Sequence, residues 1–411
     1  MSPTLKRILL FVLLFALAAL LSLALYFAFR QALPSAPTPS PTATTAPSGQ
    51  LPPAGERVPG AGVATTTVQA LPIGQPSSGV TPPSYYQPQV VSQLNSTLSL
   101  FPSTAGNGAT RYYDANNGKF YQILSNGSTQ ALSGQIFYNA QNVTWAKSAN
   151  EAVIEYSDGS KILYNFDTQK QVTLPNFWQN FSFSPNGNQI AAKSIGLSTD
   201  NRWLVTENSD GNGTQLIQPL GDNADKVIVD WSPSRQTVAL SQTGAAQTGV
   251  DNSQVLFIGL NNENFKATNV PGLDFQPQWS PTGQQLLYSV DNAASDFKPT
   301  LWIVDSYGDS IGNNRRSLDL NTWADKCAFQ NDSTLYCAVP RSLPEGAGIE
   351  PAVAAGEPDD LYKIDLKTGL KTPIPLPSGQ DFTFDTISYN AANNSLNFTD
   401  KNIAGLFQVN L

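Results

Sequence analysis

The length, composition and charge of the chain limit what it can be. It has 411 residues, a net charge of −8 at pH 7 and no histidine. An acidic chain is poorly suited to nucleic acid or to anionic lipid, both of which favour basic surfaces. Without histidine the commonest general base and metal ligand is missing, and two cysteines alone do not make a four-ligand zinc site. We therefore expect no cofactor, no metal site and no catalytic triad, and we expect the protein not to be an enzyme.

Residues 8–29 form an uncharged apolar run that follows Lys6 and Arg7 and precedes Arg30. As a helix this run would be about 33 Å long, which matches the hydrocarbon core of a bilayer. The flanking charges favour a cytoplasmic N-terminus at residues 1–7 and a head outside the cytoplasm, either periplasmic or at the cell surface. A cleaved signal peptide is the alternative, although the run is longer than a signal core and ends in bulky residues. We expect a retained signal anchor, so that the membrane is one partner of the chain.

Residues 30–84 are rich in proline, serine, threonine and alanine. Glu56 and Arg57 are the only charged residues between Gln31 and Ser84. Such a segment cannot bury enough apolar surface to offset the entropy lost on ordering. We expect a disordered linker, partly extended as polyproline II, that leads to a head at residues 85–411.

A phrase of similar sequence recurs along the head. Its clearest copies are WSPTGQQLLYSV from Trp279, WSPSRQTVALSQ from Trp231 and FSPNGNQIAAKS from Phe183. Each copy has an aromatic residue, Ser-Pro, a turn and an apolar run, and an alternating strand pattern follows. Units of about 40–50 residues with four short strands are typical of β-propeller blades. The aromatic anchors, each expected to end an innermost strand, are Phe101, Trp145, Phe183, Trp231, Trp279, Phe329 and Tyr389.

These anchors predict an all-β head folded as a seven-bladed β-propeller. Six or eight blades stay open as alternatives because the Phe101 unit is degenerate. The phrases resemble the WD40-like propeller repeat of the TolB family, which also occurs in the non-catalytic propellers of prolyl-oligopeptidase-type enzymes. The resemblance covers residues 85–411 and implies a propeller fold and a bacterial host. Neither the hydrolase domain of those peptidases nor the amino-terminal α/β domain of TolB is recognisable, so the resemblance implies a fold and no activity.

The two ends of the head complement each other. The last unit offers three strands, near Phe384–Tyr389, Ser395–Thr399 and Leu406–Leu411, and lacks an outer strand. The apolar stretch Gln89–Leu94 lies before the first anchor and belongs to no unit. Pairing this stretch beside Leu406–Leu411 would complete the last blade and remove an open sheet edge. We therefore predict that Gln89–Leu94 closes the ring.

Cys327 and Cys337 flank a turn centred on Asn331 and Asp332, which places the cysteines opposite each other on adjacent antiparallel strands. Opposed residues approach to about 4.5 Å between Cα atoms at non-hydrogen-bonded positions, which is within disulfide range. A disulfide would agree with an oxidising location, and two buried thiols are the alternative.

The connections within the predicted blades differ in length. Turns between first and second strands are tight, whereas the connections between second and third strands are long, at 194–201, 242–253, 291–299 and 340–360. In a propeller these long connections emerge on one face, and long loops on a rigid scaffold commonly carry binding residues. The longest is our candidate binding loop, and a disordered insertion without function is the alternative. Its charged residues are Arg341, Glu345, Glu350, Glu357, Asp359 and Asp360.

Together these features predict a membrane-tethered, extracytoplasmic scaffold that binds a protein or a cell-envelope component. The alternative is an exported carbohydrate-active enzyme, a lyase or a glycosidase, because paired carboxylates in the central channel could act without histidine. No carboxylate pair stands at equivalent inner-strand positions of the repeats, so we prefer the scaffold.

Overall fold

The structure is a computed structural model that describes residues 88–244 and 252–411. The helix predicted at residues 8–29 and the linker predicted at residues 30–84 lie outside the described residues. Within the described ranges, no helix is long and apolar enough to cross a bilayer.

The described residues form seven four-stranded antiparallel sheets. Blades one to six each use four consecutive strands, and blade seven combines β1 with β26–β28. The strands of blades one to four are β2 (Ser99–Thr104), β3 (Thr110–Asp114), β4 (Lys119–Ile123), β5 (Thr129–Ala131), β6 (Ala140–Trp145), β7 (Glu151–Tyr156), β8 (Lys161–Asn165), β9 (Lys170–Leu174), β10 (Trp178–Phe183), β11 (Gln189–Ile195), β12 (Arg202–Asn208), β13 (Gln215–Pro219), β14 (Val227–Val229), β15 (Ala239–Ser241), β16 (Asn252–Ile258) and β17 (Thr268–Pro271). The strands of blades five to seven are β18 (Leu273–Trp279), β19 (Gln285–Asp291), β20 (Thr300–Asp305), β21 (Arg316–Ser317), β22 (Cys327–Asn331), β23 (Thr334–Pro340), β24 (Asp359–Asp365), β25 (Lys371–Ile374), β26 (Phe384–Asn390), β27 (Ser395–Asp400), β28 (Leu406–Asn410) and β1 (Val91–Asn95).

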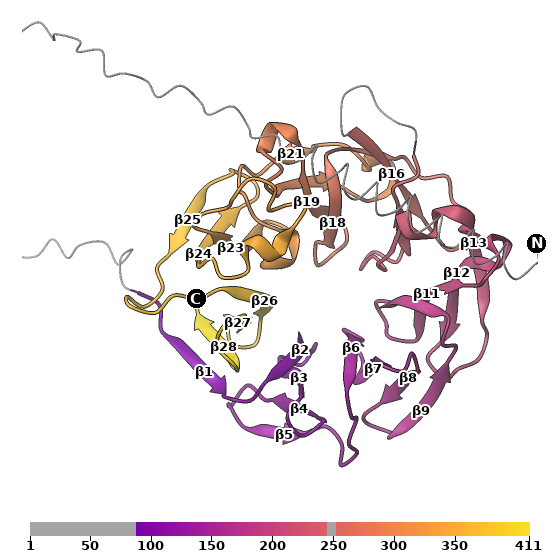
Figure 1. The fold of residues 1–411 in the computed structure, drawn as a ribbon, viewed down its shortest axis with the longest axis horizontal. Coiled ribbons are helices and arrows are strands. Elements are labelled where there is room, and N and C mark those ends of the chain that lie inside the picture. Colours follow the sequence, from indigo (N-terminus) through magenta and orange to yellow (C-terminus); the bar gives the residue numbers. More distant parts are fainter. Residues whose placement is uncertain (1–87, 245–251) are drawn as a thin grey trace, which may run out of the picture. The chain divides into compact units, whose positions relative to one another are not determined.

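The sheets stand around a central axis like the blades of a propeller (Figure 1). The first strand of each blade lies innermost and the fourth outermost, as β6 and β9 show in Figure 1. The predicted all-β, seven-bladed propeller is confirmed. Short 3-10 turns interrupt the connections, at η2 (Thr199–Asn201), η3 (Gly221–Lys226), η4 (Ala293–Ser295), η5 (Gly308–Ser310), η6 (Ala324–Lys326) and η7 (Pro351–Ala354).

Both ends of the head close blade seven. Strand β1 pairs antiparallel with β28, so that Val91 faces Val409 and Asn95 faces Leu406. The backbone N–H of Leu406 also donates to the Asn95 side-chain oxygen at 3.0 Å. Without β1 the outer edge of β28 would be unpaired, and open sheet edges promote association. The predicted closure by the strand near Gln89–Leu94 is confirmed.

Aromatic residues at the ends of inner strands join neighbouring blades. Trp145, Phe183 and Trp279 are the last residues of β6, β10 and β18, and all three are buried. The Trp145 indole N–H donates to the carbonyl of Phe101 in blade one at 2.8 Å. The Trp279 indole N–H donates to the carbonyl of Asp230 in blade four at 3.1 Å. These anchors therefore combine apolar packing with a hydrogen bond between adjacent sheets.

The remaining anchors are placed differently. Trp231 lies just beyond β14, and Phe329 and Tyr389 lie inside β22 and β26 and are half-buried. Phe101 does not end β2, contrary to the prediction. It lies mid-strand in a β-bulge with φ of 53°, three residues before the end of the strand at Thr104, because the tight turn of this blade is closed by the bond from the Gly108 N–H to the Ala105 carbonyl and so follows Thr104.

The core of the head is divided into layers between adjacent sheets. One layer packs Leu240 and Phe257 of blade four against Trp279 and Tyr288 of blade five. Another layer, between blades five and six, contains both cysteines. Cys327 faces Cys337 across β22 and β23 with their Cα atoms 4.1 Å apart, and a disulfide joins them.

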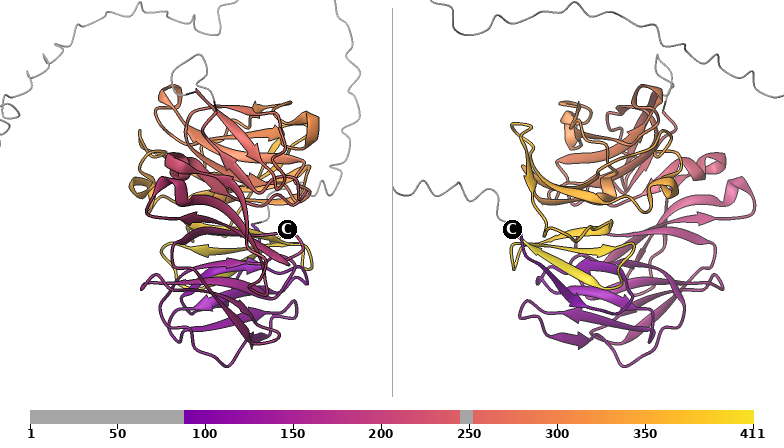
Figure 2. Two further views of the ribbon diagram at one scale, coloured as in Figure 1. Left: turned by 90° about the vertical axis from the view of Figure 1, so that its right-hand side faces the viewer. Right: turned by 60° about the vertical axis from the view of Figure 1, so that its left-hand side comes forward.

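Strand direction alternates in each blade, so the ring has two distinct faces (Figure 2). Connections between second and third strands, and those between blades, emerge on what we call the long-loop face. Hairpins between first and second strands and between third and fourth strands emerge on the tight-turn face. The connections at 196–201, 292–299 and 341–358 are found on the long-loop face, as the sequence predicts.

Candidate functional site

The longest connection, residues 341–358 between β23 and β24, is packed onto the ring. Its Gly346 N–H donates to the carbonyl of Asp296 at 2.9 Å, and its Gly348 N–H donates to the carbonyl of Phe297 at 2.7 Å. Both carbonyls belong to the long connection of the preceding blade. The loop is therefore an ordered part of the face and not a disordered insertion. Its apolar residues form a small cluster with the ring, consisting of Trp323, Leu343, Ala347 and Ala354.

Most of the charged residues predicted in this loop are at the surface. Arg341 forms ion pairs with Asp360 at 2.8 Å and with Asp381 at 2.7 Å, and all three side chains are exposed. Exposed pairs of this kind stabilise a protein by at most about 1 kcal/mol, so these groups stay free to exchange partners. Glu345 and Glu350 are exposed.

Glu357 is half-buried at the end of the loop, and Asp359 is fully buried. The Asp359 carboxylate accepts from the Lys326 ammonium at 2.8 and 2.7 Å and from the Phe384 N–H at 2.8 Å. Burial raises the pKa of Asp359, and the neighbouring Lys326 opposes this effect. Asp359 is therefore a structural link between blades six and seven. Its assignment to the binding surface is wrong, because its side chain is completely buried.

Three charged residues that the sequence analysis did not select lie at the inner rim of the same face. Asp325 precedes β22, Asp385 is the second residue of β26, and Lys401 follows β27. The Asp325 side chain reaches solvent, but the surrounding blades displace much of the water around it. This desolvation raises the pKa of Asp325. Lys326 and Lys401 oppose the increase, whereas the charge of Asp385 adds to it. Within the described residues, no group of three or more acidic or cysteine side chains is placed to hold a metal ion.

A groove of about 340 Å³ lies at the outer rim of the long-loop face. Its lining includes Arg341, the two carboxylates that pair with this arginine, Asp360 and Asp381, and the proline-rich segment 373–377. The N–H of Gln89 donates to the carbonyl of Pro375 at 2.8 Å, so the chain enters the head beside this groove.

Exposed large apolar side chains gather on the long-loop face. Of the twelve such side chains within the described residues, eight lie at strand ends or connections of this face, Tyr307 and Leu370 lie on the tight-turn face, and Val90 and Leu216 lie at the starts of the outermost strands β1 and β13. Ile349 and Val353 of the long loop are 56% and 55% exposed. The other members on this face are Leu98, Ile136, Tyr138, Phe177, Leu197 and Leu273.

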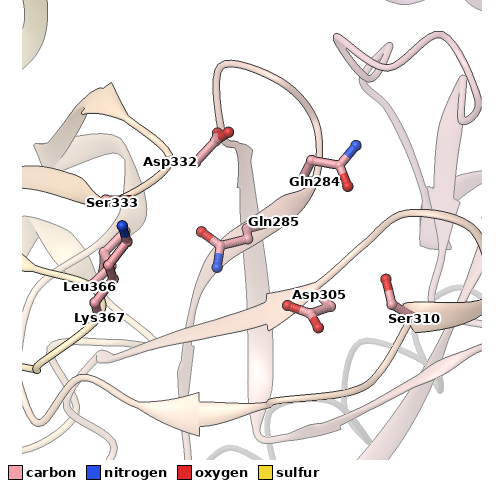
Figure 3. A pocket seen from close by; sticks show the side chains of 8 residues that line it. All are labelled: Gln284, Gln285, Asp305, Ser310, Asp332, Ser333, Leu366 and Lys367. Carbon is pink, nitrogen blue, oxygen red and sulfur yellow. The ribbon is translucent and has the colours of Figure 1, made fainter.

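The tight-turn face carries a smaller polar pocket of about 290 Å³ between blades five and six (Figure 3). Asp305, Asp332 and Gln285 line it. The Asp332 carboxylate accepts from the Thr282 hydroxyl at 2.6 Å, and the Asp305 carboxylate accepts from the Asn314 amide at 2.7 Å. Both carboxylates are thus used to hold turns in place. We therefore locate the candidate site on the long-loop face.

Comparison with known proteins supports the fold alone. No family model matches the sequence, and no curated protein does. The β-propeller domain of Cps50 (Swd1) from Myceliophteria thermophila is 12% identical, with a TM-score of 0.51 over 78% of this chain and 100% of that chain. An oligogalacturonate lyase in complex with manganese is 11% identical, with a TM-score of 0.51 over 79% and 93%. TolB from Acinetobacter baumannii is 12% identical, with a TM-score of 0.43 over 66% and 64%. The head of this chain is a seven-bladed β-propeller, similar in fold to WD40-type propellers.

Proposed function

We propose that this propeller is a non-enzymatic scaffold that binds a protein or cell-envelope partner through its long-loop face. The proposal includes a tether at residues 8–29 and a head outside the cytoplasm. The observation that supports binding is the concentration of exposed apolar side chains on one face. Apolar groups gathered on an otherwise polar surface commonly mark an interaction site.

The apolar groups of the long loop sit on a firm base. Gly348 lies so close to Asp291 that a Cβ on this glycine would be 2.5 Å from the Asp291 Cβ. Asp291 faces Leu273 in the β18–β19 register, so Leu273, Ile349 and Val353 belong to one region of the face. A region held by packing and hydrogen bonds loses little entropy when a partner binds.

The test replaces Ile349 and Val353 together with glutamate in the full-length chain. We expect the variant to lose co-purifying partners from solubilised membranes by about tenfold or more, because charged groups would have to be desolvated in the interface. The matched control places glutamate at Tyr307 and Leu370 on the tight-turn face. Both variants should melt like the parent. If the Ile349 and Val353 variant keeps its partners, the binding surface lies elsewhere.

A second candidate function is a carbohydrate-active enzyme, and the pair of Asp325 and Asp385 favours it. The two residues stand at the same end of neighbouring inner strands, and the pKa of Asp325 is raised, chiefly by desolvation and also by Asp385. Two carboxyl groups with different protonation can act as acid and base on a glycosidic bond. An oligogalacturonate lyase is among the proteins that share the propeller fold.

This second function is tested with Asp325→Asn and Asp385→Asn variants against a panel of neutral and acidic oligosaccharides. Cleavage by the parent that falls at least about 100-fold in both variants would establish it, since such groups contribute that much to general acid–base catalysis. If the parent cleaves none of the panel, the scaffold remains the proposed function.

A further inference from the structure

The two faces of the ring carry different charge. We assign each charged residue to the face that is nearer to its position in the strand or connection. At the long-loop face acidic residues outnumber basic residues roughly twofold, whereas at the tight-turn face acidic and basic residues are about equal in number. The negative potential is therefore concentrated on the long-loop face. Over blades five to seven the exposed acidic residues of this face are Asp274, Asp296, Asp319, Asp325, Glu345, Glu350, Asp360, Asp381 and Asp385.

The basic residues of the long-loop face are largely occupied. Lys326 forms an ion pair with the buried Asp359, and Arg341 forms ion pairs with two carboxylates. Lys193 is buried and donates to two backbone carbonyls. By contrast, Glu345 and Glu350 form no ion pair among the described residues. The acidic excess of the face is therefore not cancelled within the head.

We propose that the partner of the long-loop face is a basic protein surface that also presents apolar side chains. This inference rests on the proposed function because it concerns the same face. In the long loop, the exposed Ile349 and Val353 alternate with the exposed Glu345 and Glu350. A complementary surface must therefore offer lysine or arginine beside apolar groups, since buried like charges would cost several kcal/mol.

Other classes of partner match the face less well. Anionic lipid and nucleic acid are repelled by the excess of carboxylates. A small cation would neutralise charge but would leave Ile349, Val353 and Leu273 exposed to water. A basic protein surface satisfies the charge and covers the apolar groups together.

The inner rim gives the basic partner a defined anchoring point. Asp325 and Asp385 come from adjacent blades, and both are exposed. Their charges repel each other, and an arginine or lysine of the partner placed between them would relieve this repulsion. The Asp325→Asn and Asp385→Asn double variant should therefore weaken binding without weakening the head.

The experiment uses a defined probe, a short fluorescent amphipathic peptide with lysine on one face and leucine on the other. Two matched peptides replace all lysines with glutamate or all leucines with serine. Fluorescence anisotropy measures binding to the full-length protein in detergent at low and at moderate salt. A Glu345→Lys and Glu350→Lys variant is compared with an Asp210→Lys and Asp309→Lys variant, in which the same charge change falls on the tight-turn face.

We expect the lysine–leucine peptide to bind at least about tenfold tighter than either matched peptide, and more weakly at moderate salt. The Glu345 and Glu350 variant should lose about tenfold in affinity, while the tight-turn variant should bind like the parent. Equal binding by both variants, or equal binding of the glutamate peptide, overturns the basic-partner inference. That result leaves the scaffold intact if the Ile349 and Val353 variant still loses its natural partner.

Discussion

The buried pair of Lys326 and Asp359 offers a sharp test of the packing between blades six and seven. Asp359 is completely buried, and Lys326 is 5% exposed. Replacing Lys326 with methionine keeps the apolar stem but leaves the carboxylate with only the Phe384 N–H as a partner. Removing one partner of a buried ion pair typically costs about 3–5 kcal/mol.

Protonation sets an independent upper limit for this loss. An unfolded aspartate has a pKa of about 3.9, so neutralising it at pH 7 costs about 4 kcal/mol, and at pH 4.5 only about 1 kcal/mol. Without the Lys326 ammonium, the pKa of Asp359 in the folded variant lies further above the unfolded value. Its destabilisation is therefore absent below the unfolded pKa and grows as the pH rises towards the folded pKa. The variant should lose up to about 4 kcal/mol at pH 7 and no more than about 1 kcal/mol at pH 4.5.

The assay is urea unfolding followed by tryptophan fluorescence at both pH values. The matched control is Lys298→Met, because Lys298 pairs with the exposed Asp296 at 3.5 Å and should contribute less than about 1 kcal/mol. Adding Asp359→Asn to the Lys326 variant should recover most of the stability at pH 7. A loss below about 1 kcal/mol that is the same at both pH values would refute the buried, paired carboxylate.

Three further predictions concern the ring itself. Removing residues 1–84 should leave the melting temperature of the head unchanged. Removing residues 1–98 deletes β1 and exposes the edge of β28, so it should lower the melting temperature or cause aggregation. Light scattering during a thermal melt distinguishes unfolding from aggregation. Trp145→Phe should lose about 1 kcal/mol in urea unfolding because it deletes a hydrogen bond between blades. Trp231→Phe should lose much less, because the Trp231 indole N–H has no hydrogen-bond partner among residues 88–244 and 252–411. Burial raises the pKa of Asp230 to about 6, so ionisation of Asp230 increasingly opposes folding as the pH rises from the pKa of the unfolded chain towards 6. Asp230→Asn should therefore raise the melting temperature at pH 7.5 but not at pH 4.

The repeat carried most of the information about the fold. Trp145, Phe183 and Trp279 are buried where inner strands end, and an aromatic residue before a tight turn marks that position in the sequence. The Phe101 unit misled because the inner strand of blade one ends in Thr104 and not in an aromatic residue, so the aromatic residue marked a position three residues too early. Ring closure could be predicted because the strands of each unit can be counted in the sequence. The last unit has one strand too few, and one apolar stretch before the first unit is left over.

The site was less accessible to sequence reasoning. Loop length located the long-loop face, but charge within the loop did not separate the exposed Glu345 from the buried Asp359. That difference depends on Lys326, which is 33 residues away in the sequence and belongs to the connection between blades. Asp325 and Asp385 were not predicted because they lie in or beside connections between blades, whereas the length argument applied to connections within blades. Connections between blades reach the same face, so this signal was present in the sequence.

The closure of blade seven also determines when the protein can finish folding. Val91 is among the first residues of the head to be synthesised, yet its partner Val409 is almost the last. Blades one to six can assemble as the chain emerges, because each of them uses strands that are close in sequence. The ring itself stays open until β28 has been synthesised, and at about 5–20 residues per second this interval lasts tens of seconds. During that time β1 lacks the partner that covers its edge, so the head is exposed to aggregation until β28 pairs with it.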